Sequence, residues 1–198
     1  MAGDRASGSA EATPRPPQNP SYREPMRDAA GLPLWRSHEP DDYVCPFCRL
    51  AAGDVSDPQN RCELSDLVYQ DEDLLVFIAA DGFGPHAGHA MITPVAHREA
   101  LYDLDDDLLT KITLMSRDLA LAIRLAWSPE GTSVRQHNEP AGNQHVWHYH
   151  LHVFPRYSDD MLYRQLRSPL EVARRAAYAQ QLRAALLQVL SRRHSTAD

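Results

Sequence analysis

The sequence predicts an α+β domain in which a β-hairpin, a long amphipathic helix and two further strands follow one another. Apolar residues 67–69 and 74–80 flank the polar stretch 70–73, a pattern typical of a hairpin. Over residues 105–127 the apolar positions recur three and four apart, which indicates a helix packed on a sheet. Residues 148–153 alternate between histidine and other side chains, as a half-buried strand does.

Length and composition limit the class of protein. A chain of 198 residues with 43% hydrophobic residues fits one domain with an extension. The net charge of -7 argues against a nucleic acid or an anionic membrane as the main partner, so any bound phosphate needs local donors. Because the sequence has no run of about 18 apolar residues and no apolar signal core at its N-terminus, we expect neither membrane insertion nor secretion, and a cytoplasmic location.

The chain divides into three predicted parts. Residues 1–40 hold seven of the 15 prolines and few apolar residues, which predicts a disordered arm. The folded domain is expected over residues 41–160. Residues 161–198 are expected to form a C-terminal helical extension. Its helix is expected to begin at Ser168 and to run to about Arg193, because Ser-Pro-Leu-Glu supplies an N-cap, a proline at the first position and a glutamate at the third. Its apolar side suggests packing or a dimer contact.

Three histidines, His148, His150 and His152, are two residues apart. In a strand they would share one face, roughly 6.5 to 7 Å from one another. The opposite face would carry Trp147, Tyr149, Leu151 and Val153. Such imidazoles can surround one phosphate, or one can bind a metal while its neighbour stays free. A surface cluster or an accidental metal-binding tract is the alternative, and the apolar alternation argues against it.

Two cysteines, Cys45 and Cys48, form a Cys-x-x-Cys sequence. This spacing suits one tetrahedral zinc ion and equally suits a redox pair, and the spacing alone leaves both open. With Cys62 the chain has three cysteines, which is no disulfide framework. We expect Cys62 to be inert.

The run His148-Tyr-His-Leu-His-Val-Phe154 resembles the signature of the histidine-triad family, and the resemblance covers roughly residues 43–157. It implies a mostly antiparallel sheet with the long helix packed on it, usually paired as a homodimer. Zinc-binding members share one metal between Cys-Pro-x-Cys and two histidines. The matching residues here are Cys45, Cys48, His97 and His148. A site of this composition is closed, so the resemblance implies structural zinc.

The resemblance also implies a nucleotide substrate, attacked at its α-phosphorus by the central histidine, His150. A backbone carbonyl would orient the other ring nitrogen of His150, and the resulting nucleotidyl-histidine would be cleaved in a second step. The phosphate would be held by His152, Gln144 and Asn138, which can donate hydrogen bonds to its oxygens.

Members of the family carry an acidic or amide residue that binds ribose hydroxyls, shortly before a Gly-His pair. Asp81 and His89 match this arrangement. A carboxylate can accept from two vicinal hydroxyls. On spacing alone, Asp81 is equally an ordinary turn residue ahead of Gly82.

The chain departs from the family pattern in two places. Around Asp81 it has Ala79, Ala80 and Gly82 where aliphatic side chains usually line the base, which leaves the base preference open. Large side chains that could replace them are Phe77, Ile78 and Phe83. After Gln144 it has His145 where serine or threonine is common. His145 is either a general acid or an exposed loop residue.

The favoured function is hydrolysis of a nucleoside phosphoramidate or a dinucleoside polyphosphate. One alternative is a nucleotidyl transferase, although related transferases usually replace the third histidine, here His152, with glutamine. Another is a nucleotide-binding regulator with little turnover, which the intact His150 makes less attractive. A catalytic zinc site ranks last, because the strand contains no glutamate to act as its base.

Overall fold

The computed structural model describes residues 28–31, 34–58, 60–83 and 88–195, which form parts of two compact units, residues 1–36 and 37–198. Most of the arm predicted to be disordered, residues 1–40, lies outside the described residues. In the first unit, Asp28 and Gly31 close a turn in which the Gly31 N–H donates to the Asp28 carbonyl at 3.0 Å.

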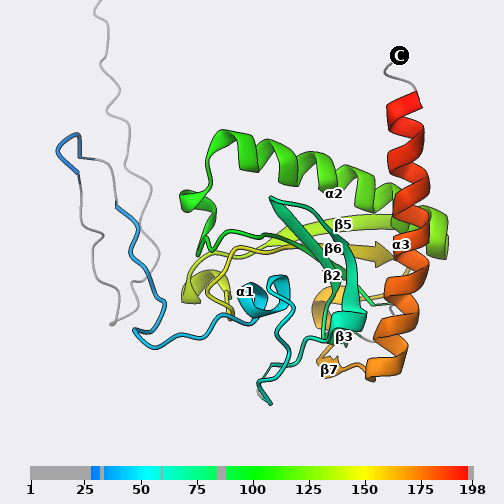
Figure 1. Ribbon diagram of the computed structural model, residues 1–198, viewed down its shortest axis with the longest axis horizontal. Helices are drawn as coiled ribbons and strands as arrows, with labels where there is room; N and C mark the ends of the chain where they lie inside the picture. The colour runs from blue at the N-terminus through cyan, green and yellow to red at the C-terminus, as the bar shows by residue number, and fades with distance from the viewer. Residues whose placement is uncertain (1–27, 32–33, 59, 84–87, 196–198) are drawn as a thin grey trace, which may run out of the picture. The chain divides into compact units, whose positions relative to one another are not determined.

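The second unit is built on a five-stranded sheet in the order β1-β2-β4-β6-β5, and every neighbouring pair in it is antiparallel (Figure 1). Its strands are β1 Leu67–Gln70, β2 Leu74–Ile78, β4 Ala90–Pro94, β5 Gly131–Gln136 and β6 Leu151–Arg156. The predicted hairpin is β1 and β2, and the mostly antiparallel α+β fold is confirmed.

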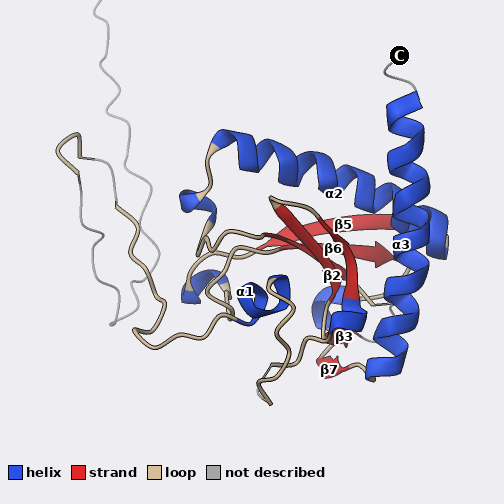
Figure 2. Ribbon diagram, viewed as in Figure 1, coloured by secondary structure: helices blue, strands red, loops and turns tan. Residues whose placement is uncertain are grey.

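Helices lie on both faces of this sheet (Figure 2). The long helix α2, Asp106–Trp127, and the C-terminal helix α3, Val172–Ser195, pack on one face, and the short helix α1, Pro46–Ala51, packs on the other. The remaining short turns are 3₁₀ helices: η1 Leu64–Asp66, η2 Leu101–Asp103, η3 Pro140–Gly142 and η4 Leu162–Arg164. In the described part of the chain, no helix combines the length and apolar character needed to cross a bilayer.

Strand β2 is buried on both faces, which explains its uninterrupted apolar sequence. Val76 and Ile78 belong to the core formed with α2 and α3. Leu75 and Phe77 belong to the core formed with α1. Because successive side chains of a strand alternate, one apolar strand fills both cores. The sheet is therefore a shared wall between a helical core and the side that carries α1.

Strand β6 is shorter than the alternation predicts, because it begins at Leu151 and leaves His148 and His150 in the segment before it. Local hydrogen bonds replace the ladder there: the Tyr149 N–H donates to the Arg98 carbonyl at 2.6 Å, and Thr93 Oγ1 donates to the Tyr149 carbonyl at 2.7 Å. Tyr149 still packs into the helical core. The predicted partition of the faces holds from Tyr149 onward.

The C-terminal helix begins later than predicted. Instead of capping a helix at Ser168, residues Arg167–Pro169 form strand β7, which pairs with β3, Asp81–Phe83, and the helix starts at Val172. Pairing across the two segments thus overrides the local capping pattern. Farther along α3, Leu182 and Leu186 are buried in the core that α2 also lines.

Helix α3 is also tied to the sheet edge by a buried ion pair. Arg175 Nε lies 3.0 Å from Asp66 Oδ1, and the two side chains are 4% and 0% exposed. Burial raises the pKa of Asp66, although its hydrogen bonds with the Glu63 N–H and Arg175 favour the ionised form. Removing the cation alone would leave a buried carboxylate without its charged partner.

We therefore expect Arg175→Met to lower the free energy of unfolding by about 3 kcal/mol. The neighbouring Arg174→Met serves as the control: Arg174 is exposed, donates from Nε to Tyr178 Oη and lies over the Tyr178 ring, so its loss should cost less than about 1 kcal/mol. Urea denaturation followed by circular dichroism measures both. Equal losses would contradict a special role for the ion pair.

Candidate functional site

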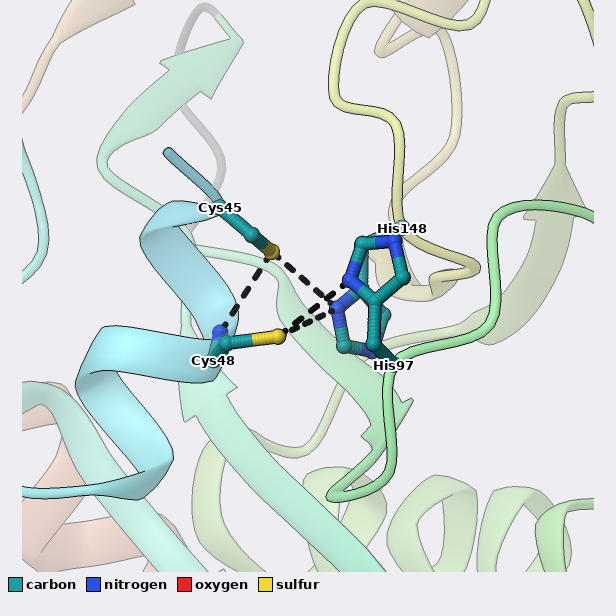
Figure 3. A group of neighbouring side chains, drawn as sticks. All are labelled: Cys45, Cys48, His97 and His148. Atoms are coloured by element: carbon teal, nitrogen blue, oxygen red, sulfur yellow. Dashed lines mark hydrogen bonds between the residues drawn. The ribbon is translucent and has the colours of Figure 1, made fainter. Parts of the chain in front are cut away.

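Two cysteines and two histidines from separate segments meet beside the sheet (Figure 3). Cys45 caps α1 and Cys48 lies within it, whereas His97 follows β4 and His148 precedes β6. Their four ligand atoms lie within 4.8 Å of one another. Cys45 Sγ is 3.2 Å from His148 Nδ1, and Cys48 Sγ is 3.3 Å from His97 Nδ1. A tetrahedral zinc with ordinary bond lengths needs sulfur–nitrogen separations of about 3.5 Å, so this donor set can hold one metal ion.

The outer nitrogens of both histidines are held by oxygen acceptors. His148 Nε2 lies 2.9 Å from the Pro94 carbonyl, and His97 Nε2 lies 2.7 Å from the Glu39 carboxylate. Because a carbonyl only accepts, Nε2 of His148 carries the proton and Nδ1 presents its lone pair to the sulfurs. Burial lowers the pKa of His148 to about 3, which favours the neutral ring that a metal binds.

A cavity of about 620 Å³ lies on the same side of the sheet as α1. It is lined by five histidines and three arginines but only one carboxylate among the described residues. Its polar lining includes Asn60, Arg61, Asp81, His89, Arg135, His137, Asn143, His145, His150, His152, Gln165 and Arg167. Of the predicted catalytic and substrate-binding residues, the structure brings Asp81, His89, His145, His150 and His152 to this one cavity.

His150 has one ring nitrogen engaged and one open. Its Nδ1 lies 2.7 Å from the His148 carbonyl and so must donate, which leaves the lone pair on Nε2. Phe47 packs edge-on against the ring with centroids 5.5 Å apart. Burial lowers the pKa of His150 to about 4, so its ring is neutral at neutral pH. A neutral imidazole with a fixed proton and an accessible lone pair is chemically a nucleophile or a base.

His152 sits at the centre of a group of imidazoles. Its ring centroid is 5.0 Å from those of both His89 and His150, and 6.1 Å from that of His137. Its Nδ1 is buried without a hydrogen-bond partner in the described structure. Burial, followed by the neighbouring His89, lowers the pKa of His152 well below its usual value. An unpaired buried nitrogen of this kind is suited to a ligand atom.

Asp81 is the carboxylate of the cavity, and arginines surround it. Arg61 binds it with two contacts of 3.0 and 2.5 Å, and Arg167 approaches to 4.0 Å. A Cβ at the neighbouring Gly82 would lie 2.8 Å from Leu170 Cδ2, so a larger residue there would have to displace the Leu170 side chain. Leu170, in the C-terminal extension, thus packs against Gly82 beside Asp81.

The two amides expected to hold the phosphate lie outside the cavity lining. Gln144 is buried, and its side chain bonds the Glu139 N–H and the carbonyls of Glu99 and Val146. Asn138 accepts from the Leu101 N–H at 2.8 Å. Both amides therefore shape the loop before His145, because their hydrogen-bonding groups are taken up by the protein.

His145 lines the cavity and is exposed, with Nε2 lying 3.1 Å from Asn143 Oδ1. The structure thus puts it within the site while leaving its side chain in contact with solvent. Both predicted roles, general acid and exposed loop residue, are compatible with this position.

Two cavity residues, Arg135 and His137, were missed by the sequence analysis. Both lie on or next to β5, and Arg135 pairs directly with His152 of β6. Their alternation within residues 131–137 places them on one face, which was readable from the sequence. The register of β5 against β6 was not readable, so nothing identified the face that meets the histidines.

The HIT domain family model matches residues 61–159, half of the chain. Protein hit of Bacillus subtilis is 34% identical over 113 residues, which cover 57% of this chain and 71% of that protein. The chain belongs to the HIT family. This agrees with the three histidines and with the confirmed fold.

Two other HIT relatives are informative. A structure described as a Zn-bound histidine triad family protein from Mycobacterium smegmatis has a TM-score of 0.61 and 28% identity, covering 75% of this chain and 96% of that one. An adenosine 5'-monophosphoramidase of Saccharomyces cerevisiae is 27% identical over 135 residues, covering 67% of this chain and 77% of that protein.

If the four ligands of this HIT protein hold zinc, purified protein should contain about one zinc ion per chain. Cys45→Ser should lose the metal and lower the unfolding temperature by about 5 °C or more, because binding energy is folding energy. Cys62→Ser is the matched control: Cys62 is buried outside the cluster, so this variant should keep the zinc ion. Metal analysis by mass spectrometry tests this, and well-folded, metal-free wild type would refute it.

Proposed function

We propose that this HIT protein hydrolyses a nucleotide at its α-phosphate, through a nucleotidyl-histidine formed on His150. The observation that carries the proposal is the orientation of His150: Nδ1 donates to the His148 carbonyl at 2.7 Å, and the ring lines a cavity with Nε2 unpaired among the described residues. The cavity volume of about 620 Å³ is suited to a small-molecule ligand of nucleotide size.

In the first step the Nε2 lone pair of His150 bonds to the α-phosphorus. The bond from phosphorus to the leaving oxygen or nitrogen breaks, and its electron pair departs with the leaving group. The ring becomes a cationic imidazolium, and the His148 carbonyl at its Nδ1–H stabilises the charge. A leaving amine also needs a proton, for which we propose His145, since it lines the cavity.

In the second step water attacks the same phosphorus, the phosphorus–nitrogen bond breaks, and its electron pair returns to Nε2. The water proton passes to solvent, and the product is a nucleoside monophosphate. We propose His152 as a donor to the phosphate oxygens, because its ring lies beside that of His150 in the cavity. His137 is outside this set, because its Nδ1–H donates to the Gly142 carbonyl at 2.6 Å and leaves a lone pair on Nε2 of the neutral ring. Asn138 and Gln144 are left out of this set because their amides are engaged elsewhere.

The relatives support the reaction class. The yeast relative is named an adenosine 5'-monophosphoramidase, which cleaves a phosphorus–nitrogen bond at an α-phosphate. The Mycobacterium smegmatis structure is described as Zn-bound, which supports structural zinc at Cys45, Cys48, His97 and His148. We further propose a cytoplasmic homodimer: reducing conditions would keep the thiols available for metal, and the dimer rests on family resemblance.

We expect His150→Gln to lower the turnover of adenosine 5'-phosphoramidate by at least about 1,000-fold, because no other side chain replaces the nucleophile. His38→Gln is the control, an exposed histidine outside the cavity lining, and it should stay within about twofold of wild type. Acid quenching with nucleotide labelled at the α-phosphorus should trap label on wild type and none on His150→Gln. Full activity of His150→Gln would end the proposal.

Asp81 is proposed to accept hydrogen bonds from the ribose hydroxyls. Asp81→Ala should raise the KM of a ribonucleotide substrate about tenfold and leave the KM of its 2',3'-dideoxy analogue within about twofold, because only the former has the hydroxyls. The analogue is the internal control for indirect effects through Arg61. If both KM values rise equally, Asp81 acts by holding Arg61 instead.

A further inference from the structure

Arg135 lies next to His152 on the cavity wall. The two residues are directly paired across β5 and β6, so their side chains share one face of the sheet, with Cβ atoms about 5 Å apart. On its other side, His152 is paired with Met91 of β4, which also lines the cavity. In the sheet order β2-β4-β6-β5, Arg135 therefore lies across the histidine strand from β2, which leads into Asp81.

Aromatic rings hold the Arg135 guanidinium in place. Its central carbon lies 5.0 Å from the ring centroid of Phe154, 5.6 Å from that of Phe83 and 6.0 Å from that of Tyr163. Cation–π contacts of this kind fix the plane of the guanidinium while leaving its hydrogen-bond donors free. The side chain is thus pre-positioned for a ligand.

Arg135 also carries a charge that the described protein does not neutralise. The other cavity arginines, Arg61 and Arg167, both lie at Asp81, whereas Arg135 has no carboxylate partner among the described residues. Its Nε is buried without a hydrogen-bond partner, as is Nδ1 of the adjacent His152. Two unpaired buried nitrogens therefore lie beside each other, one of them on a permanently cationic guanidinium, and this arrangement fits an anion.

The chemistry of arginine selects among anions and leaving groups. A guanidinium holds its protons at any physiological pH, so it cannot protonate a departing amine. It can bind phosphate oxygens with two parallel hydrogen bonds and stabilise the negative charge that a departing phosphate gains. A neutral amine leaving group offers Arg135 nothing to bind.

We propose that Arg135 is a specificity residue that binds a second phosphoryl group of the substrate, beyond the α-phosphate attacked by His150. This rests on the proposed function and selects within it: substrates whose leaving group is a phosphate, such as dinucleoside polyphosphates, are preferred over phosphoramidates. Because the net charge of the protein is -7, this recognition is local and does not arise from general attraction of anions.

The test compares two substrates that share adenosine and the α-phosphate: diadenosine triphosphate and adenosine 5'-phosphoramidate. Arg135→Met keeps an apolar stem against the rings and removes the charge. It should lower kcat/KM for diadenosine triphosphate by about 10- to 100-fold and change that for the phosphoramidate by less than about threefold. Arg135→Lys, which keeps the charge, should recover part of the loss. Thermal unfolding of each variant checks that it is folded.

Arg167→Met is the matched control, because Arg167 lines the same cavity but lies at Asp81, and it should affect both substrates alike. Equal losses on the two substrates in Arg135→Met, or no loss on either, would overturn the inference. If Arg135→Met does not fold, the same comparison is made with Arg135→Lys against wild type, where loss of the bidentate contact should still weaken diadenosine triphosphate selectively.

A binding measurement separates this inference from the proposed function. In the His150→Gln background, calorimetry compares AMP with ATP, and Arg135→Met should lower the affinity for ATP about tenfold or more while leaving that for AMP within about twofold. If wild type turns over neither substrate, the proposed function fails, and this ratio alone decides the role of Arg135. An unchanged ATP to AMP ratio would overturn it.

Discussion

One residue, His148, links the metal-ligand cluster to the proposed nucleophile. Its ring is placed between Cys45 and Cys48 by the Pro94 carbonyl, and its own carbonyl accepts from Nδ1 of His150. The peptide group between ring and nucleophile is rigid, so the orientation of His150 depends on the cluster that anchors its neighbour. A metal ion bound by this cluster would therefore help to orient His150 without contacting the substrate.

His148 and His150 lie outside the regular strand, whereas His152 lies within it. The ladder of β6 begins only at Leu151, and before it the chain is fastened by single hydrogen bonds to Arg98 and Thr93. Irregular backbone lets the His148 carbonyl turn toward its neighbour's ring, which a carbonyl paired in a ladder could not do. The site thus lies where sheet pairing gives way to specific contacts.

Much of the fold could be predicted because periodicity reports burial directly. The hairpin, helix α2 and the alternation from Tyr149 onward follow from apolar spacing alone. Strand register and tertiary pairing cannot be read from apolar spacing. The helix cap predicted at Ser168 was therefore wrong, because Arg167–Pro169 form β7, which pairs with β3.

The residues of the candidate site were likewise predictable only in part. The cluster of Cys45, Cys48, His97 and His148 came from residue types and resemblance, and the structure brings these residues together. Arg135 and His137 were missed because only the pairing of β5 with β6 turns them toward His152. Asn138 was expected at the phosphate, yet the adjacent His137 faces the cavity, since a shift of one residue reverses the face of an extended chain.

The cavity is lined by two parts of the chain, the sheet with its neighbouring loops and the C-terminal segment, and Leu170 packs against Gly82 where these two parts meet. The cavity histidines lie on and beside the sheet, whereas the lining residues within 162–167 belong to the segment that leads into α3. Changes of length or sequence in that segment would reshape this part of the cavity lining while leaving His150 and His152 in place. Substrate selectivity in this fold can therefore change through the C-terminal segment while the residues proposed for the chemistry stay the same.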